Sequence, residues 1–273
     1  MYNPNESGGL IDRVGRWLHR RRHPTRCYAI CAVARSGSNL LCDGLRATGR
    51  AGKPLQFFCE KLEGRYGERH GLDPVHDYAG YVRGIVQRTS TRNNVVGVKL
   101  MGLDLERFLM RLRQTGAFGT PAGSELQILQ AALPRLQFIQ IRRRDRLRQA
   151  ISRVRALQSD LWKSGDKESA VAKAKFDPRL ISQSIRAARR VEEIWSAFFF
   201  RNGIEPFLVE YEDLAADYAG SVRAVLKFLR IRLARGFKIG EPTTVRQADA
   251  ISQKWEERYR ALVAERSDLV TYV

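Results

Sequence analysis

Residues 26–49 read RCYAICAVARSGSNLLCDGLRATG, and this stretch carries the clearest fold signal in the chain. Its first part, residues 27–34, is a continuous apolar run with the length of a strand buried on both faces. A short polar turn follows, and leucines then recur at helical spacing until Gly49, a typical helix end. A strand, a small-residue turn and a helix in this order predict an anion-binding turn, because backbone N–H groups and the positive end of the helix dipole face it.

The turn itself contains four residues suited to holding an anion. Gly37 lets the backbone approach closely, Ser36 and Ser38 add hydroxyl donors, and Arg35 supplies a permanent positive charge. The nucleotide-triphosphatase pattern GxxxxGK[ST] is absent, since this turn has one glycine and no lysine. A kinase or nucleotide triphosphatase is therefore excluded, and the remaining alternative for this stretch alone is an ordinary tight turn of an α/β protein.

Composition limits the kinds of partner. The chain has 273 residues and a formal net charge of +19, from 48 Lys+Arg against 29 Asp+Glu. Such a charge attracts polyanions in general, but no aromatic stacking cluster or known reader motif accompanies it, so specific nucleic-acid binding is not expected. The four cysteines show no Cys-x-x-Cys or Cys/His ligand spacing. We therefore expect no metal, buried free thiols and a cytoplasmic location.

The first 25 residues form a basic arm ahead of a single domain, residues 26–273. Apolar residues in this arm recur at helical spacing among arginines, which is typical of a helix docked on its own domain or a mobile arm. Peripheral contact with an anionic membrane is the less favoured alternative. No signal peptide or membrane-spanning run is visible.

Three further buried strands are predicted at residues 95–101, 136–141 and 205–210, with helices between them. This alternation predicts an α/β fold with a central parallel sheet covered by helices on both faces, whose ligands bind beyond the carboxyl ends of the strands. Lys99 lies near one strand end, and Arg143 sits at another. Together with Ser152 on the next helix, Arg143 is predicted to hold a second anion at some distance from the turn. The polar, glycine-rich residues 59–76 are expected to form an irregular binding loop.

Several blocks of the sequence are similar to the sulfotransferases of the mycobacterial trehalose-sulfotransferase type, a bacterial branch of the sulfotransferases that use 3′-phosphoadenosine 5′-phosphosulfate (PAPS). The matching blocks are ARSGSNLLCDGLRATGRAGKP at 34–54, GVKLM at 97–101, RRRDRLRQAISRVRALQSDLW at 142–162, VEYEDLAADYAGSVRAVLKFLRI at 209–231 and RQADAISQKWEERYRAL at 246–262. The resemblance implies a P-loop-like sulfotransferase fold and transfer of a sulfuryl group to a carbohydrate or glycolipid hydroxyl, with trehalose as the example. It also implies a homodimer, which the residues themselves do not indicate.

The resemblance assigns roles to individual residues. Arg35 to Asn39 would cradle the 5′-phosphosulfate, with Arg35 at a position where many sulfotransferases carry lysine. Arg143 and Ser152 would hold the 3′-phosphate. The segment expected to close over the nucleotide contains Arg246, Gln247 and Asp249.

The general base is the point at which this chain departs from the family pattern. After GxP the pattern has a glutamate two residues on, but this chain has Gln56, and an amide cannot take a proton at neutral pH. Three alternatives stay open: Glu60 is the base, His70 or His76 is the base, or the protein is a nucleotide-binding relative with little or no transfer activity. Glu63 is expected to be an ordinary solvated carboxylate.

Lys99 has two interpretations. It ends a buried strand on the ligand edge, so we expect it to contact the sulfate or the acceptor. The alternative is a charge that simply caps the strand.

Overall fold

The computed structural model describes residues 26–120, 122–159, 174–242 and 250–265. Its described strands are β1 (Arg26–Ala32), β2 (Val95–Met101), β3 (Gln137–Arg142) and β4 (Phe207–Glu210). They pair in the order β2-β1-β3-β4, and every pairing is parallel. The predicted α/β fold with a central parallel sheet is confirmed, with strand bounds within two residues of those expected.

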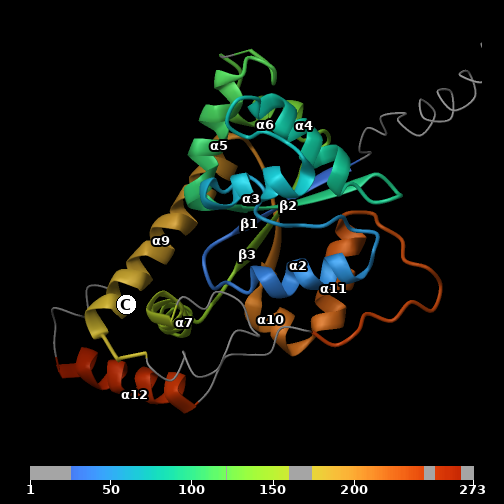
Figure 1. Ribbon diagram of the computed structural model, residues 1–273. Coiled ribbons are helices and arrows are strands. Elements are labelled where there is room, and N and C mark those ends of the chain that lie inside the picture. Colours follow the sequence, from blue (N-terminus) through green and yellow to red (C-terminus); the bar gives the residue numbers. More distant parts are fainter. Residues whose placement is uncertain (1–25, 121, 160–173, 243–249, 266–273) are drawn as a thin grey trace, which may run out of the picture.

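Helices connect and cover the strands. In chain order they are α2 (Ser38–Ala47), α3 (Glu60–His70), α4 (Tyr78–Thr89), α5 (Gly102–Gln114), α6 (Glu125–Ala132), α7 (Arg146–Ser159), α9 (Pro178–Arg201), α10 (Tyr211–Ala216), α11 (Tyr218–Phe228) and α12 (Ala250–Glu265). Figure 1 shows α4, α5 and α6 on one side of the sheet and α2, α10 and α11 on the other. Among the described residues, no helix combines the length and apolar composition needed to cross a lipid bilayer.

The apolar run of β1 is buried on both faces of the sheet. Cys27, Ala29 and Cys31 belong to the core shared with α4, α5 and α6. Tyr28 and Ile30 belong to the core shared with α2 and α11 on the opposite face. Because successive side chains of a strand point to opposite faces, a run without polar interruptions is required when helices cover both.

A third apolar cluster joins α7, α9 and α12 beside the sheet. Helix α9 is fixed to the carboxyl end of β1 by Trp195, whose Nε1 donates a hydrogen bond of 3.2 Å to the carbonyl of Ala32. Trp195 is fully buried and packs against Phe198 and Phe199. This arrangement brings α7 and α9 next to the strand ends where a ligand is expected.

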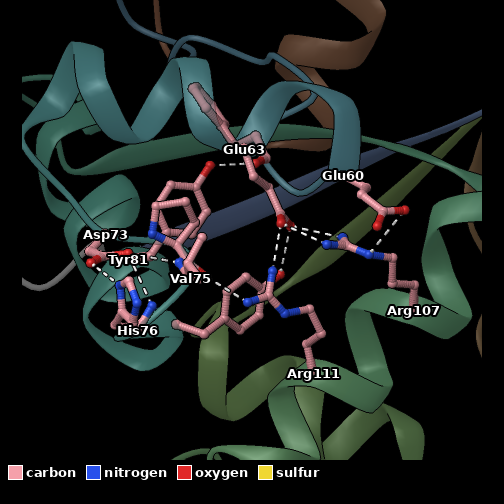
Figure 2. A network of polar contacts seen from close by, with 11 residues as sticks. Glu60, Glu63, Asp73, Val75, His76, Tyr81, Arg107 and Arg111 are labelled. Atoms are coloured by element: carbon pink, nitrogen blue, oxygen red, sulfur yellow. Dashed lines mark hydrogen bonds and ion pairs between the residues drawn. The ribbon is translucent and has the colours of Figure 1, made fainter.

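The prediction of an irregular loop over residues 59–76 was wrong for residues 60–70, which form α3. The helix is held by Glu63, which is 3% exposed and accepts hydrogen bonds from Arg107, Arg111 and the hydroxyl of Tyr78. Figure 2 shows this network, with both arginines reaching Glu63 from α5. Glu63 is therefore a buried, paired carboxylate and not a solvated one. Because the two arginines lie more than 40 positions further along the chain, no local sequence pattern could predict that Glu63 is paired.

Candidate active site

The turn between β1 and α2 has the backbone shape of an anion cradle. Arg35 and Gly37 both have positive φ values, 63° and 84°, and α2 begins directly after them without a side-chain cap. Its first backbone N–H groups therefore keep their donors available for a ligand. The hydroxyl of Ser36 is buried and has no hydrogen-bond partner among the described residues. An unpartnered buried donor at a helix start fits a bound anion.

Tyr211 packs so closely on the turn that Gly37 is required for a second reason. A Cβ atom at Gly37 would lie 2.3 Å from the Cδ2 atom of the Tyr211 ring. The same ring lies under the guanidinium of Arg143, with Cζ 4.5 Å from the ring centroid. Tyr211 thus contacts both predicted anion sites. The sequence analysis did not assign it this role, although its position directly after β4 could have placed it at the ligand edge of the sheet.

Arg35 and Ser152 are in direct contact. The Nε of Arg35 donates a hydrogen bond of 2.9 Å to the hydroxyl of Ser152 on α7. Burial lowers the pKa of Arg35, and the neighbouring charges of Arg143 and Arg155 lower it further. The residues predicted for the 5′-phosphosulfate and those predicted for the 3′-phosphate are therefore in contact, and not at some distance from one another as the sequence suggested.

Arg143 is a second desolvated cation at this edge. Burial lowers the pKa of its guanidinium, and its Nε is buried without a hydrogen-bond partner among the described residues. The carboxylate of Glu212 has Oε1 4.0 Å from that Nε. Glu212 is also held by the backbone N–H groups of Arg144 and Asp145, at 3.1 and 3.2 Å. Two desolvated guanidinium groups near each other favour a multiply charged anion between them.

Two further contacts set the shape of the turn. Gln149, which is 1% exposed, donates a hydrogen bond of 2.8 Å from Nε2 to the carbonyl of Ala34. Lys99, which is 8% exposed, donates from Nζ to Oδ1 of Asn39 at 2.5 Å. The side chain of Lys99 thus contacts α2 at the predicted cofactor site. This contact favours the interpretation of Lys99 as a ligand-edge residue over a charge that only caps its strand. The role of Gln149 was not predicted, because a glutamine within a run of arginines carries no distinctive signal.

Gln56 lies beside the end of β2. Leu55 forms an isolated parallel bridge with Val98, and its carbonyl accepts a hydrogen bond of 2.9 Å from the backbone N–H of Lys99. The chain can approach this strand because Gly52, with φ of 78°, has no Cβ; one placed there would lie 2.5 Å from the backbone nitrogen of Gly97. Gln56, at the position where the family resemblance implies a base, therefore directly follows a residue whose backbone is hydrogen-bonded to Lys99.

The three substitute bases named from the sequence have these surroundings. Glu60 is the first residue of α3; its side chain is 74% exposed, and its Oε2 lies 3.6 Å from Nε of Arg107. His76 is bound to Asp73 through Nδ1 at 2.8 Å and is exposed (Figure 2). His70 ends α3, and partial burial together with nearby arginines lowers its pKa.

Some predicted features fall outside the described residues. These are the C-terminal cofactor segment with Arg246, Gln247 and Asp249, and the basic arm of residues 1–25. The predicted nucleotide closure and membrane contact therefore stay predictions, as does the homodimer that the resemblance implies.

Comparisons with known proteins agree on the family. A model of the Stf0 sulphotransferase family matches residues 27–262. Trehalose 2-sulfotransferase from Mycolicibacterium smegmatis is 31% identical over 265 residues, covering 87% of this chain and 95% of that protein. Trehalose 2-sulfotransferase from Mycobacterium tuberculosis is 29% identical over 264 residues, covering 86% and 95%.

Among solved structures, a sulfotransferase from Alicyclobacillus acidocaldarius aligns with a TM-score of 0.40 and 16% identity, covering 90% of this chain and 96% of that one. The sequence comparisons extend over nearly the whole described domain, including the turn at Arg35 and the segment around Arg143. The chain belongs to the Stf0 sulfotransferase family.

Proposed function

We propose that the protein transfers the sulfuryl group of PAPS to a hydroxyl of a carbohydrate or glycolipid. The observation that carries the proposal is the pairing of Arg35 with Ser152 beside the desolvated Arg143. PAPS has two separated anionic groups, and the contiguous cations would bind both. Trehalose enters as an acceptor only because the two relatives bear its name.

The donor set suits sulfuryl transfer. PAPS supplies the sulfuryl group as a substrate, and the acceptor oxygen attacks it in line with the departing phosphate. Arg35, Ser36 and the backbone N–H groups at the start of α2 would stabilise negative charge that develops on that phosphate. Lys99, held at the same edge by Asn39, would contact the sulfuryl oxygens.

Calorimetric titration with PAP, the product nucleotide, tests the proposal. We expect wild type to bind PAP in the micromolar range and Arg143→Ala to weaken binding by about 10–100-fold, since a hydrogen bond to a charged group contributes about 1.5–3 kcal/mol. The matched control is Arg146→Ala, because Arg146 lies three residues on and pairs with Glu192 at 2.7 Å. No PAP binding to wild type at moderate salt would sink the proposal.

A second candidate function is nucleotide binding with little transfer. Gln56 favours it, because a side-chain amide can hold an acceptor hydroxyl and cannot remove its proton. Tight PAP binding without sulfuryl transfer from labelled PAPS to any hydroxyl compound would support this candidate over the first.

A further inference from the structure

A cavity of about 340 Å³ lies beyond the carboxyl ends of β1 and β2, between α5, α7 and α9. It is lined by Val33, Ala34, Met101, Gly102, Leu103, Glu106, Gln149, Ala150, Arg153, Ser184, Ala187, Ala188, Arg190, Val191 and Ile194. Its volume is in the range of small-molecule sites, roughly 300–1,000 Å³. None of the residues assigned to the nucleotide lines it, so it has room for another compound.

The cavity shares a wall with the anion-binding turn. Ala34, which directly precedes Arg35, lines it, and so does Gln149, whose Nε2 holds the Ala34 carbonyl. A compound in the cavity would therefore lie next to the turn that we assign to the phosphosulfate. Met101 at the end of β2 completes this wall two residues after Lys99.

The lining indicates an amphiphilic occupant. Most of the wall is aliphatic, including Met101, Val191 and Ile194, and a polyhydroxylated sugar would leave many hydroxyls unpaired against it. Arg153 is the charged residue that α7 contributes to the lining: its Nε is buried and has no hydrogen-bond partner among the described residues. Such a group favours a negatively charged partner within the cavity.

Glu106 is the carboxylate of this lining. Elsewhere near α5, Glu63 is committed to Arg107, Arg111 and Tyr78, and Glu60 lies near Arg107. By contrast, Glu106 is exposed to solvent as well as lining the cavity, and no hydrogen bond or ion pair engages it within the described part of the chain, so its carboxylate is available to a ligand.

We propose that this cavity binds the sulfuryl acceptor, that Glu106 takes the proton from its hydroxyl, and that Arg153 with the aliphatic walls selects an amphiphilic, negatively charged compound. The proposal rests on the proposed function and narrows its acceptor class. In the reaction, the acceptor O–H bond breaks as its proton moves to Glu106 and the oxygen forms a bond to sulfur. The bond from sulfur to the 5′-phosphate oxygen breaks, PAP leaves with that electron pair, and Glu106 later releases the proton to water.

Binding is tested by calorimetry at saturating PAP with three probes below micelle-forming concentrations: trehalose, octyl glucoside and octyl glucuronide. The second adds an alkyl chain to a sugar, and the third adds a carboxylate as well. We expect octyl glucuronide to bind about tenfold more tightly than octyl glucoside, because its carboxylate can form a charge-assisted hydrogen bond with Arg153. Trehalose should bind most weakly of the three. Arg153→Gln removes the preference for the glucuronide.

Ala187→Trp fills the cavity from α9 and is expected to weaken octyl glucuronide binding about tenfold or more while PAP affinity stays unchanged. Ala197→Trp, on the exposed part of the same helix, is the matched control. Equal octyl glucuronide affinity in these two variants would overturn the assignment of the cavity.

The base is tested by sulfuryl transfer from labelled PAPS to octyl glucuronide. We expect Glu106→Gln to lower kcat by about 10²-fold or more without changing PAP affinity. Glu193→Gln, an exposed carboxylate outside the cavity, is the control. Added formate is expected to restore part of the activity to Glu106→Ala, which a purely structural role would not permit.

The failures are distinguishable. If PAP does not bind wild type, the proposed function falls and this inference falls with it. If PAP binds but wild type transfers to none of the three probes, or Glu106→Gln keeps full kcat, the inference alone is overturned. A hundredfold rise in kcat on Gln56→Glu would also overturn it, since the missing base would then belong at position 56.

Discussion

Arg35→Ala is expected to lower sulfuryl transfer from PAPS by about 10²–10³-fold, the usual cost of removing one preorganised group that stabilises transition-state charge. The reason lies in its position: Arg35 is in the turn that precedes α2 and is joined to Ser152 of α7. Its loss removes the charge that faces the departing phosphate. It also removes the hydrogen bond that joins the two predicted anion sites. Labelled PAPS and a competent acceptor measure the rate, and PAP calorimetry measures the binding contribution.

Arg35→Lys is the matched control. It keeps the charge but loses the hydrogen bond from Nε to Ser152, so we expect it to retain the larger part of the activity. Neither variant changes the left-handed backbone at this position, where φ is 63°, and the free energy of unfolding should move by less than about 0.5 kcal/mol. Wild-type turnover in Arg35→Ala would show that another group neutralises the departing phosphate.

Glu63→Ala is expected to lower the free energy of unfolding by about 3–5 kcal/mol, the usual cost of breaking a buried ion pair from one side. Glu63 is 3% exposed and binds Arg107 through both carboxylate oxygens, at 3.0 and 2.8 Å, and Arg111 at 2.6 Å. Its loss leaves two guanidinium groups and the hydroxyl of Tyr78 without their acceptor.

Thermal unfolding checks this, with an expected fall in the midpoint of about 6–15 °C for a domain of this size. The control is Glu60→Ala on the same helix, since Glu60 is 74% exposed and only approaches Arg107 at 3.6 Å. Its effect should stay below about 1 kcal/mol, as for other surface pairs. Equal midpoints for the two variants would mean that the buried network contributes no more than an exposed one.

Much of the fold could be predicted because its signals are local. The apolar run before Arg35 indicates a strand covered on both faces, and the alternation of strands and helices predicts a parallel sheet. The edge of the sheet that carries the site followed from the same reasoning, because Arg35 lies in the turn after β1 and Arg143 directly follows β3.

The candidate site was predicted less completely. Arg35, Arg143 and Ser152 were named from strand ends and family resemblance, and the structure brings them together. Tyr211 and Gln149 were missed as positioning residues, although one packs on the turn and the other holds it. Glu106, which we propose as the base, was not singled out from the sequence either, because a glutamate on an amphipathic helix looks the same whether it faces bulk solvent or a cavity.

The sequence alone determined the strand–turn–helix at Arg35, the parallel sheet and the cationic character of its ligand edge. Only the tertiary structure decided that residues 60–70 are helical, that Glu63 is paired, and that Glu106 and Arg153 line one cavity. The physical reason is the separation in sequence over which each kind of interaction acts. Periodicity and turn chemistry act over a few residues, whereas Glu63 meets Arg107 across 44 positions and Arg35 meets Ser152 across 117. Contacts at such separations depend on how whole elements pack.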